Sequence, residues 1–145
     1  MTEALIQALC NPDVQEYIRT HEHEDVGKLV LKHQLILGIP SAVVAQQIAA
    51  RKKARQKLPT WYNQSGIIYP PMINLEQASS ETTARYKQKM MVAARVADLT
   101  GGFGVDTFYM SQVCKKVIYV EPDESLSRIA EHNLGLLGAK NIQYP

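Results

Sequence analysis

The stretch RVADLTGGFGVDTFYMSQVCKKVIYVE, residues 95–121, decides the fold class of this chain. It contains a short apolar segment, a glycine-rich turn, a helix-like segment and a second apolar segment, KVIYV. With the residues that follow, strand and helix patterns alternate over 95–99, 104–114, 116–120, 123–137 and 141–144. Strands that alternate with helices of this length predict an α/β fold with a parallel sheet.

Residues 1–57 predict an N-terminal helical region without strands. After a first helical segment, Asp25 is expected to cap a second helix that continues through Leu37 and is closed by Gly38. A third helix is expected to begin at Ser41 and to run into a basic end. The domain organisation therefore starts with a helical unit.

Residues 58–91 are expected to form a connector and one helix. Prolines and a glycine up to residue 74 prevent a continuous helix there, and Ser79-Ser80-Glu81 can cap a helix that reaches about Met91. Residues 92–145 then form the N-terminal part of a Rossmann-like domain. Because fewer than three strand–helix units do not close such a sheet, we expect an incomplete Rossmann-like sheet and an N-terminal piece of a longer polypeptide.

The glycine loop predicts a site for a nucleotide-type cofactor. Gly101, Gly102 and Gly104 allow a sharp turn and a close approach of the main chain to a ligand. Glu121 stands 17 residues beyond Gly104, at the end of the second strand, where a carboxylate can accept hydrogen bonds from both hydroxyls of a ribose.

The details of the loop favour S-adenosylmethionine over a dinucleotide. A dinucleotide fingerprint, G-x-G-x-x-G, would need a third glycine where Thr107 stands. Asp98, at the end of the first strand, would repel a pyrophosphate but attract the sulfonium and ammonium of S-adenosylmethionine. The alternative is that Asp98 caps a turn and that the glycines only make a tight bend.

Two segments then resemble a known family. DLTGGFGVD and VIYVEPDESLSRIAEHNL resemble motifs I and II of class I S-adenosylmethionine-dependent methyltransferases. With RKKARQKLPTW (51–61) and NLEQASSETTARYK (74–87), they are similar to a bacterial family that has a THUMP-like domain at its C-terminus. The resemblance implies transfer of a methyl group, with a base nitrogen in RNA as the leading substrate and DNA or another substrate as the alternatives.

The resemblance also implies roles for individual residues. The methionine half of the cofactor would lie among Asp98, Thr100, Gly101, Gly102 and Gly104. Glu121 would bind the ribose and Pro122 would lie against the adenine. Thr100 departs from the common pattern, in which glycine stands at that position, and this departure indicates a subfamily.

A further segment resembles the Q-x-T-P-E motif that lies over the methionine carboxylate in adenine-specific methyltransferases and trimethylguanosine synthases. Here it reads Gln77-Ala78-Ser79-Ser80-Glu81, with Ser80 where proline is usual. The hydroxyl of Ser79 and the N–H groups of a helix start would form an anion site. The alternative is that Ser79 is only a helix cap.

The residues that would carry out methyl transfer are missing from this stretch. Amino-group methylation in such families uses a later D/N-P-P-Y/F motif, which positions the target nitrogen. No such motif follows Glu121, so we assign no catalytic residue.

A basic segment makes RNA a candidate partner. Its cations are Arg51, Lys52, Lys53 and Arg55, followed by Lys57, and Trp61 and Tyr62 stand close behind them. Cations beside aromatic rings can contact phosphates and stack on bases. The alternative is a solvated helix end.

The composition limits the remaining function classes. The net charge of +2 alone does not imply a nucleic-acid partner, and no apolar run is long enough to span a membrane. Cys10 and Cys114 lie far apart, which favours a reduced, cytoplasmic protein. The pair His21 and His23 lacks a third ligand at a diagnostic spacing, so no metal site is assigned. The alternative functions are a non-catalytic cofactor- or RNA-binding module and a nicotinamide-dependent oxidoreductase.

Overall fold

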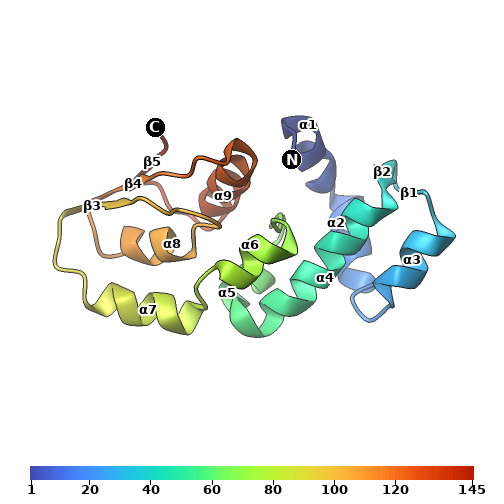
Figure 1. Ribbon diagram of the computed structural model, residues 1–145, viewed down its shortest axis with the longest axis horizontal. Helices are drawn as coiled ribbons and strands as arrows, with labels where there is room; N and C mark the ends of the chain where they lie inside the picture. The colour runs from blue at the N-terminus through green and yellow to red at the C-terminus, as the bar shows by residue number, and fades with distance from the viewer.

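A computed structural model describes residues 1–145 as a mixed α/β fold (Figure 1). The helices are α1 (Glu3–Leu9), α2 (Pro12–Thr20), α3 (Val26–Lys32), α4 (Ser41–Lys57), α5 (Pro59–Asn63), α6 (Met72–Gln77), α7 (Glu81–Lys89), α8 (Val105–Ser111) and α9 (Glu124–Leu136). The strands are β1 (Leu35–Ile36), β2 (Ile39–Pro40), β3 (Arg95–Asp98), β4 (Lys116–Tyr119) and β5 (Ile142–Gln143).

The predicted parallel sheet is confirmed. Its strand order is β3-β4-β5, and Asp98 pairs with Tyr119 at the carboxyl ends of the first two strands. Helix α8 packs against β3 and β4, and α7 packs against α8, on one side of this sheet (Figure 1). Val117 and Tyr119 are buried, whereas Ile118 between them and its partner Ala97 on β3 are exposed. One face of the sheet therefore belongs to the core and the other faces solvent.

The helix that the sequence predicts after Asp25 is shorter than expected. Helix α3 begins after the Asp25 cap, as expected, but ends at Lys32. Strands β1 and β2 then form a small antiparallel hairpin, so the prediction that residues 1–57 contain no strands is wrong. Leu37 and Gly38 have φ values of 50° and 80°. Two successive residues with positive φ are the geometry of a tight hairpin turn, so Gly38 closes a hairpin and not a helix.

The three segments expected from the sequence share one core. Trp61 of α5 is fully buried and meets Phe108 of α8 edge-on, with ring centroids 5.1 Å apart. Two buried amides fix the extended chain between α5 and α6. The Asn133 side chain accepts from the Ile68 N–H at 2.9 Å and donates to the Ile68 carbonyl at 2.7 Å. Gln47 does the same for Tyr69, at 2.8 and 2.7 Å, so this connector joins α4 to α9.

Long apolar helices are not part of this fold. No helix of the chain combines the length and the hydropathy that a membrane crossing requires.

Candidate cofactor site

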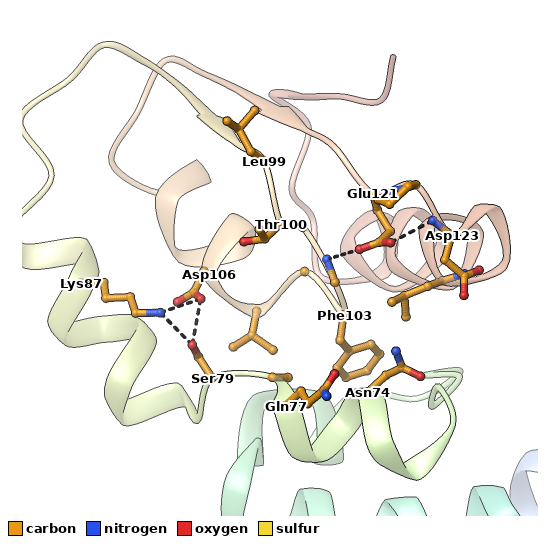
Figure 2. A pocket seen from close by; sticks show the side chains of 17 residues that line it. Asn74, Gln77, Ser79, Lys87, Leu99, Thr100, Phe103, Asp106, Glu121 and Asp123 are labelled. Atoms are coloured by element: carbon orange, nitrogen blue, oxygen red, sulfur yellow. Dashed lines mark hydrogen bonds and ion pairs between the residues drawn. The ribbon is translucent and has the colours of Figure 1, made fainter.

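A cleft of about 610 Å³ lies at the carboxyl ends of β3 and β4. Eight residues that the sequence assigns to the cofactor lie in its lining: Gln77, Ser79, Thr100, Gly101, Gly102, Gly104, Glu121 and Pro122. They come from the end of α6, the loop before α7, the glycine loop and the end of β4 (Figure 2). The folded chain therefore brings together segments that are more than 40 residues apart in sequence.

The three glycines of the loop differ in what a side chain at each position would meet. A Cβ on Gly101 would overlap the ring carbons of Tyr119, so no side chain fits there. Gly104 has a φ of 85°, and a Cβ would lie 2.9 Å from Leu134 of α9. Gly102 has a φ of 54° and lies open towards the cleft. Packing against β4 and α9 thus requires Gly101 and Gly104.

Asp98 does not line the cleft, in contrast to the other predicted cofactor residues. It is 8% exposed, and its carboxylate accepts hydrogen bonds from the Thr107 hydroxyl at 2.6 Å and from the Thr100 N–H at 3.2 Å. These contacts tie the glycine loop to the first turn of α8 from behind. The geometry therefore gives Asp98 the loop-fixing contacts of the turn-capping alternative.

Glu121 lies at the opposite end of the loop, held by two main-chain groups. Oε2 accepts from the Gly102 N–H at 3.0 Å and Oε1 accepts from the Asp123 N–H at 2.9 Å (Figure 2). Each carboxylate oxygen can accept more than one hydrogen bond, so both remain available to hydroxyl groups of a ligand. The two N–H groups fix the orientation of the carboxylate at the edge of the cleft.

A charged cluster, formed by Ser79, Lys87 and Asp106, lies across the cleft from Glu121 (Figure 2). The Ser79 hydroxyl donates to Asp106 Oδ2 at 2.8 Å, and Lys87 Nζ donates to Ser79 Oγ and to Asp106 Oδ2 at 2.9 Å each. Asp106 Oδ1 is buried and has no hydrogen-bond partner. The cap of α7 is Ser80, which accepts from the Thr83 N–H, so Ser79 is free of that role.

The sequence pattern alone does not single out Lys87 and Asp106. Lys87 lies in the second half of α7, whereas Ser79 precedes the cap of that helix, so helical periodicity does not relate the two residues. Nothing in the sequence relates Asp106 to either residue, since α8 approaches α7 only through tertiary packing.

The segment around Ser79 is anchored by a buried carboxylate, Glu81. It is 5% exposed and accepts from the Thr60 N–H at 2.5 Å, the Thr60 hydroxyl at 2.9 Å and the Tyr109 hydroxyl at 2.9 Å. These bonds join the start of α7 to α5 and α8. Glu81 therefore fixes the position of the chain that enters the cleft at Ser79.

The basic segment at the end of α4 is largely engaged within the chain. Arg51 donates to buried Glu22 at 3.2 Å and its guanidinium stacks over the Tyr62 ring at 4.1 Å. Lys52 donates to the Glu24 carbonyl at 3.0 Å, and Lys53 lies 3.6 Å from Glu76.

Lys57 and Arg55, the other two cations of the segment, differ in whether they contact the rest of the chain. Lys57 donates to the carbonyls of Leu75 and Glu76 at the end of α6, and desolvation with the nearby Lys53 lowers its pKa. Arg55 is exposed and has no intrachain hydrogen bond or ion pair. Arg55 is thus the cation most accessible to an external partner.

Comparison with known proteins adds one likeness. No protein-family profile and no curated protein matches the sequence. The structure is similar to the crystal structure of a "putative methyltransferase" from Porphyromonas gingivalis W83, with a TM-score of 0.80 and 28% sequence identity. The match covers 99% of this chain and 35% of that chain, so this chain spans about a third of the length of its neighbour. The likeness supports a methyltransferase fold for the chain.

Proposed function

We propose that this chain forms most of the cofactor site of an S-adenosylmethionine-dependent methyltransferase. The observation that carries the proposal is a single cleft with a fixed carboxylate, Glu121, at one end and the Ser79–Lys87–Asp106 cluster at the other. S-adenosylmethionine has hydroxyl groups on its ribose and opposite charges on its amino-acid end. The cleft volume of about 610 Å³ falls within the usual range of ligand sites, about 300–1,000 Å³.

The charge of the cleft supports this cofactor over a dinucleotide. Three carboxylates, Asp106, Glu121 and Asp123, line it against one ammonium, that of Lys87. A cleft with this excess of negative charge attracts a ligand whose net charge is positive and repels a pyrophosphate. The sulfonium and ammonium of S-adenosylmethionine outnumber its carboxylate.

The residues of the chain would bind and orient the cofactor. Bound S-adenosylmethionine would supply an electrophilic methyl group. Glu121 would accept the ribose hydroxyls, Pro122 would lie against the adenine, and Phe103 and Leu126 provide apolar contact in the same cleft. No side chain of this chain is assigned to the methyl acceptor, because no D/N-P-P-Y/F motif, which would position the acceptor, follows Glu121.

We propose a base nitrogen in RNA as the methyl acceptor, in a cytoplasmic protein whose cysteines Cys10 and Cys114 are both free. Support comes from the location of the basic segment. Lys53 and Lys57 contact the end of α6, which leads directly to Gln77 in the cleft. Arg55, on the same helix end, is free to contact a phosphate. An RNA backbone bound there would run beside the cleft.

Calorimetric titration of the protein with S-adenosylhomocysteine and with NAD tests the cofactor. We expect heat of binding with S-adenosylhomocysteine and none with NAD at the same concentration. Binding of NAD without binding of S-adenosylhomocysteine would overturn the proposal and favour a nicotinamide-dependent oxidoreductase. A single-turnover assay of methyl incorporation into RNA then separates an enzyme from a binding module.

A further inference from the structure

We propose that Lys87 and Asp106 form an ion pair that the amino-acid end of the ligand separates, with Lys87 taking the ligand carboxylate and Asp106 taking its ammonium. The inference rests on the proposed function, and it names the groups that recognise one end of the cofactor. Asp106, eight positions after Asp98, then takes the role that the sequence suggests for Asp98, which is to attract the cationic end of the ligand.

The contacts of Asp106 make its carboxylate a better partner for a cationic ligand than the carboxylate of Asp98. Its Oδ2 is shared by the Ser79 hydroxyl and the Lys87 ammonium, whereas its Oδ1 is buried without a partner. A carboxylate with an unpaired oxygen is unfavourable, and a ligand ammonium would provide a further donor to Asp106 if the carboxylate turns towards the cleft as Lys87 moves away. Both oxygens of Asp98 already have donors, and Asp98 lies outside the lining of the cleft.

Lys87 is the only cation in the lining of the cleft. Its side chain is 43% exposed, so it can move from Asp106 to a ligand carboxylate while its ammonium stays in contact with water. Arg85 on the same helix lies over the Tyr109 ring, 5.3 Å from its centroid, and near Glu81, away from this lining. No other side chain in the cleft can neutralise a carboxylate.

The exchange conserves charge within the cluster. A zwitterion inserted between Lys87 and Asp106 replaces one ion pair by two, and Ser79 can still donate to either carboxylate. Because the initial pair is partly exposed, its separation costs little, whereas the new hydrogen bonds are charge-assisted. The cluster should therefore discriminate ligands by their amino-acid end and ignore their adenosine end.

Titrations with three ligands test this assignment. S-adenosylhomocysteine has both charged groups, its decarboxylated analogue has only the ammonium, and 5′-methylthioadenosine has neither. Lys87→Met should weaken S-adenosylhomocysteine by roughly 10- to 100-fold and should weaken neither of the other two ligands. Asp106→Asn should weaken both ligands that carry the ammonium and leave 5′-methylthioadenosine unchanged.

Two variants of α7 serve as controls, and two outcomes would contradict the assignment or the proposed function. Lys89→Met removes an exposed cation from the same helix and should change none of the affinities, and Lys87→Arg should retain binding of S-adenosylhomocysteine. If Lys87→Met and Asp106→Asn affect all three ligands equally, or none, the assignment is wrong although the cofactor site stands. If the unaltered protein binds neither S-adenosylhomocysteine nor 5′-methylthioadenosine, the proposed function itself fails.

Discussion

The Tyr119 hydroxyl donates a hydrogen bond of 2.6 Å to the carbonyl of Gly102, and the same ring occupies the space that a side chain at Gly101 would need. Burial, with Glu121 and Asp98 nearby, raises the pKa of the Tyr119 phenol, so this donor keeps its proton over the usual pH range. One residue of β4 thus fixes the glycine loop that follows β3. The shape of the cleft depends on this contact between neighbouring strands.

Substitution Gly101→Ala should destabilise the protein by about 1–3 kcal/mol, because the added Cβ would overlap the Tyr119 ring. Urea unfolding followed by circular dichroism measures this change. Gly135→Ala is the matched control. Gly135 lies within α9, and an added methyl group there would meet open space, so alanine should add about 0.5–1 kcal/mol of stability. Equal stability of the two variants would contradict the packing role of Gly101.

The glycine loop illustrates what sequence reasoning can and cannot foresee. The order of strand, glycine turn, helix and strand is a local pattern, and the structure confirms it. Which side chain meets each glycine depends on the neighbouring strand and on α9, which no local pattern specifies. The same limit explains Asp98: its position at the strand end is predictable, but its bond to Thr107 is a property of the folded loop.

Substitution Glu81→Ala should cost about 2–4 kcal/mol of unfolding free energy, since the Thr60 N–H and the Tyr109 hydroxyl would lose a buried acceptor. Chemical denaturation provides the measurement. Glu124→Ala, which removes a carboxylate with 83% of its side chain exposed, should change stability little. A Glu81→Ala protein as stable as the Glu124→Ala protein would show that the carboxylate does not anchor α7.

Substitution Glu121→Ala should weaken S-adenosylhomocysteine by roughly 10- to 100-fold, because a ribose hydroxyl would lose a charged acceptor. Stability should change little, since water can reach the Gly102 and Asp123 N–H groups that the carboxylate leaves. Calorimetry gives the affinity and urea unfolding gives the stability. Glu131→Ala, on the exposed face of α9, serves as the control. Unchanged affinity in Glu121→Ala would count against the ribose role.

The basic segment shows a second limit of sequence reasoning. The run of cations correctly marks the end of α4, where Lys57 precedes Leu58 and Pro59, and the residue before a proline avoids the helical conformation. The sequence treats these cations as equivalent. In the folded chain Arg51 binds Glu22, 29 residues away, whereas Arg55 makes no hydrogen bond or ion pair, and only tertiary packing makes that distinction.

Substitutions Arg51→Ala and Arg55→Ala should therefore differ in their effect on stability. Arg51→Ala removes the cation beside buried Glu22 and the stacking on Tyr62, and should cost about 1–3 kcal/mol of unfolding free energy. Arg55→Ala should leave stability unchanged, because its side chain makes no contact that folding depends on.

RNA binding, in contrast, should be weakened more by Arg55→Ala than by Arg51→Ala. Fluorescence anisotropy with a labelled single-stranded RNA, repeated over a range of salt concentrations, should show weaker binding for Arg55→Ala and a salt slope reduced by about 1. Lys89→Ala, at the exposed end of α7, provides a charge-matched control that should bind RNA as the unaltered protein does. If Arg55→Ala and Lys89→Ala bind RNA equally well, the end of α4 is a solvated helix end and the phosphate contact is wrong. If Arg51→Ala loses RNA binding at unchanged stability, Arg51 faces the RNA, and its bond to Glu22 does not stabilise the fold.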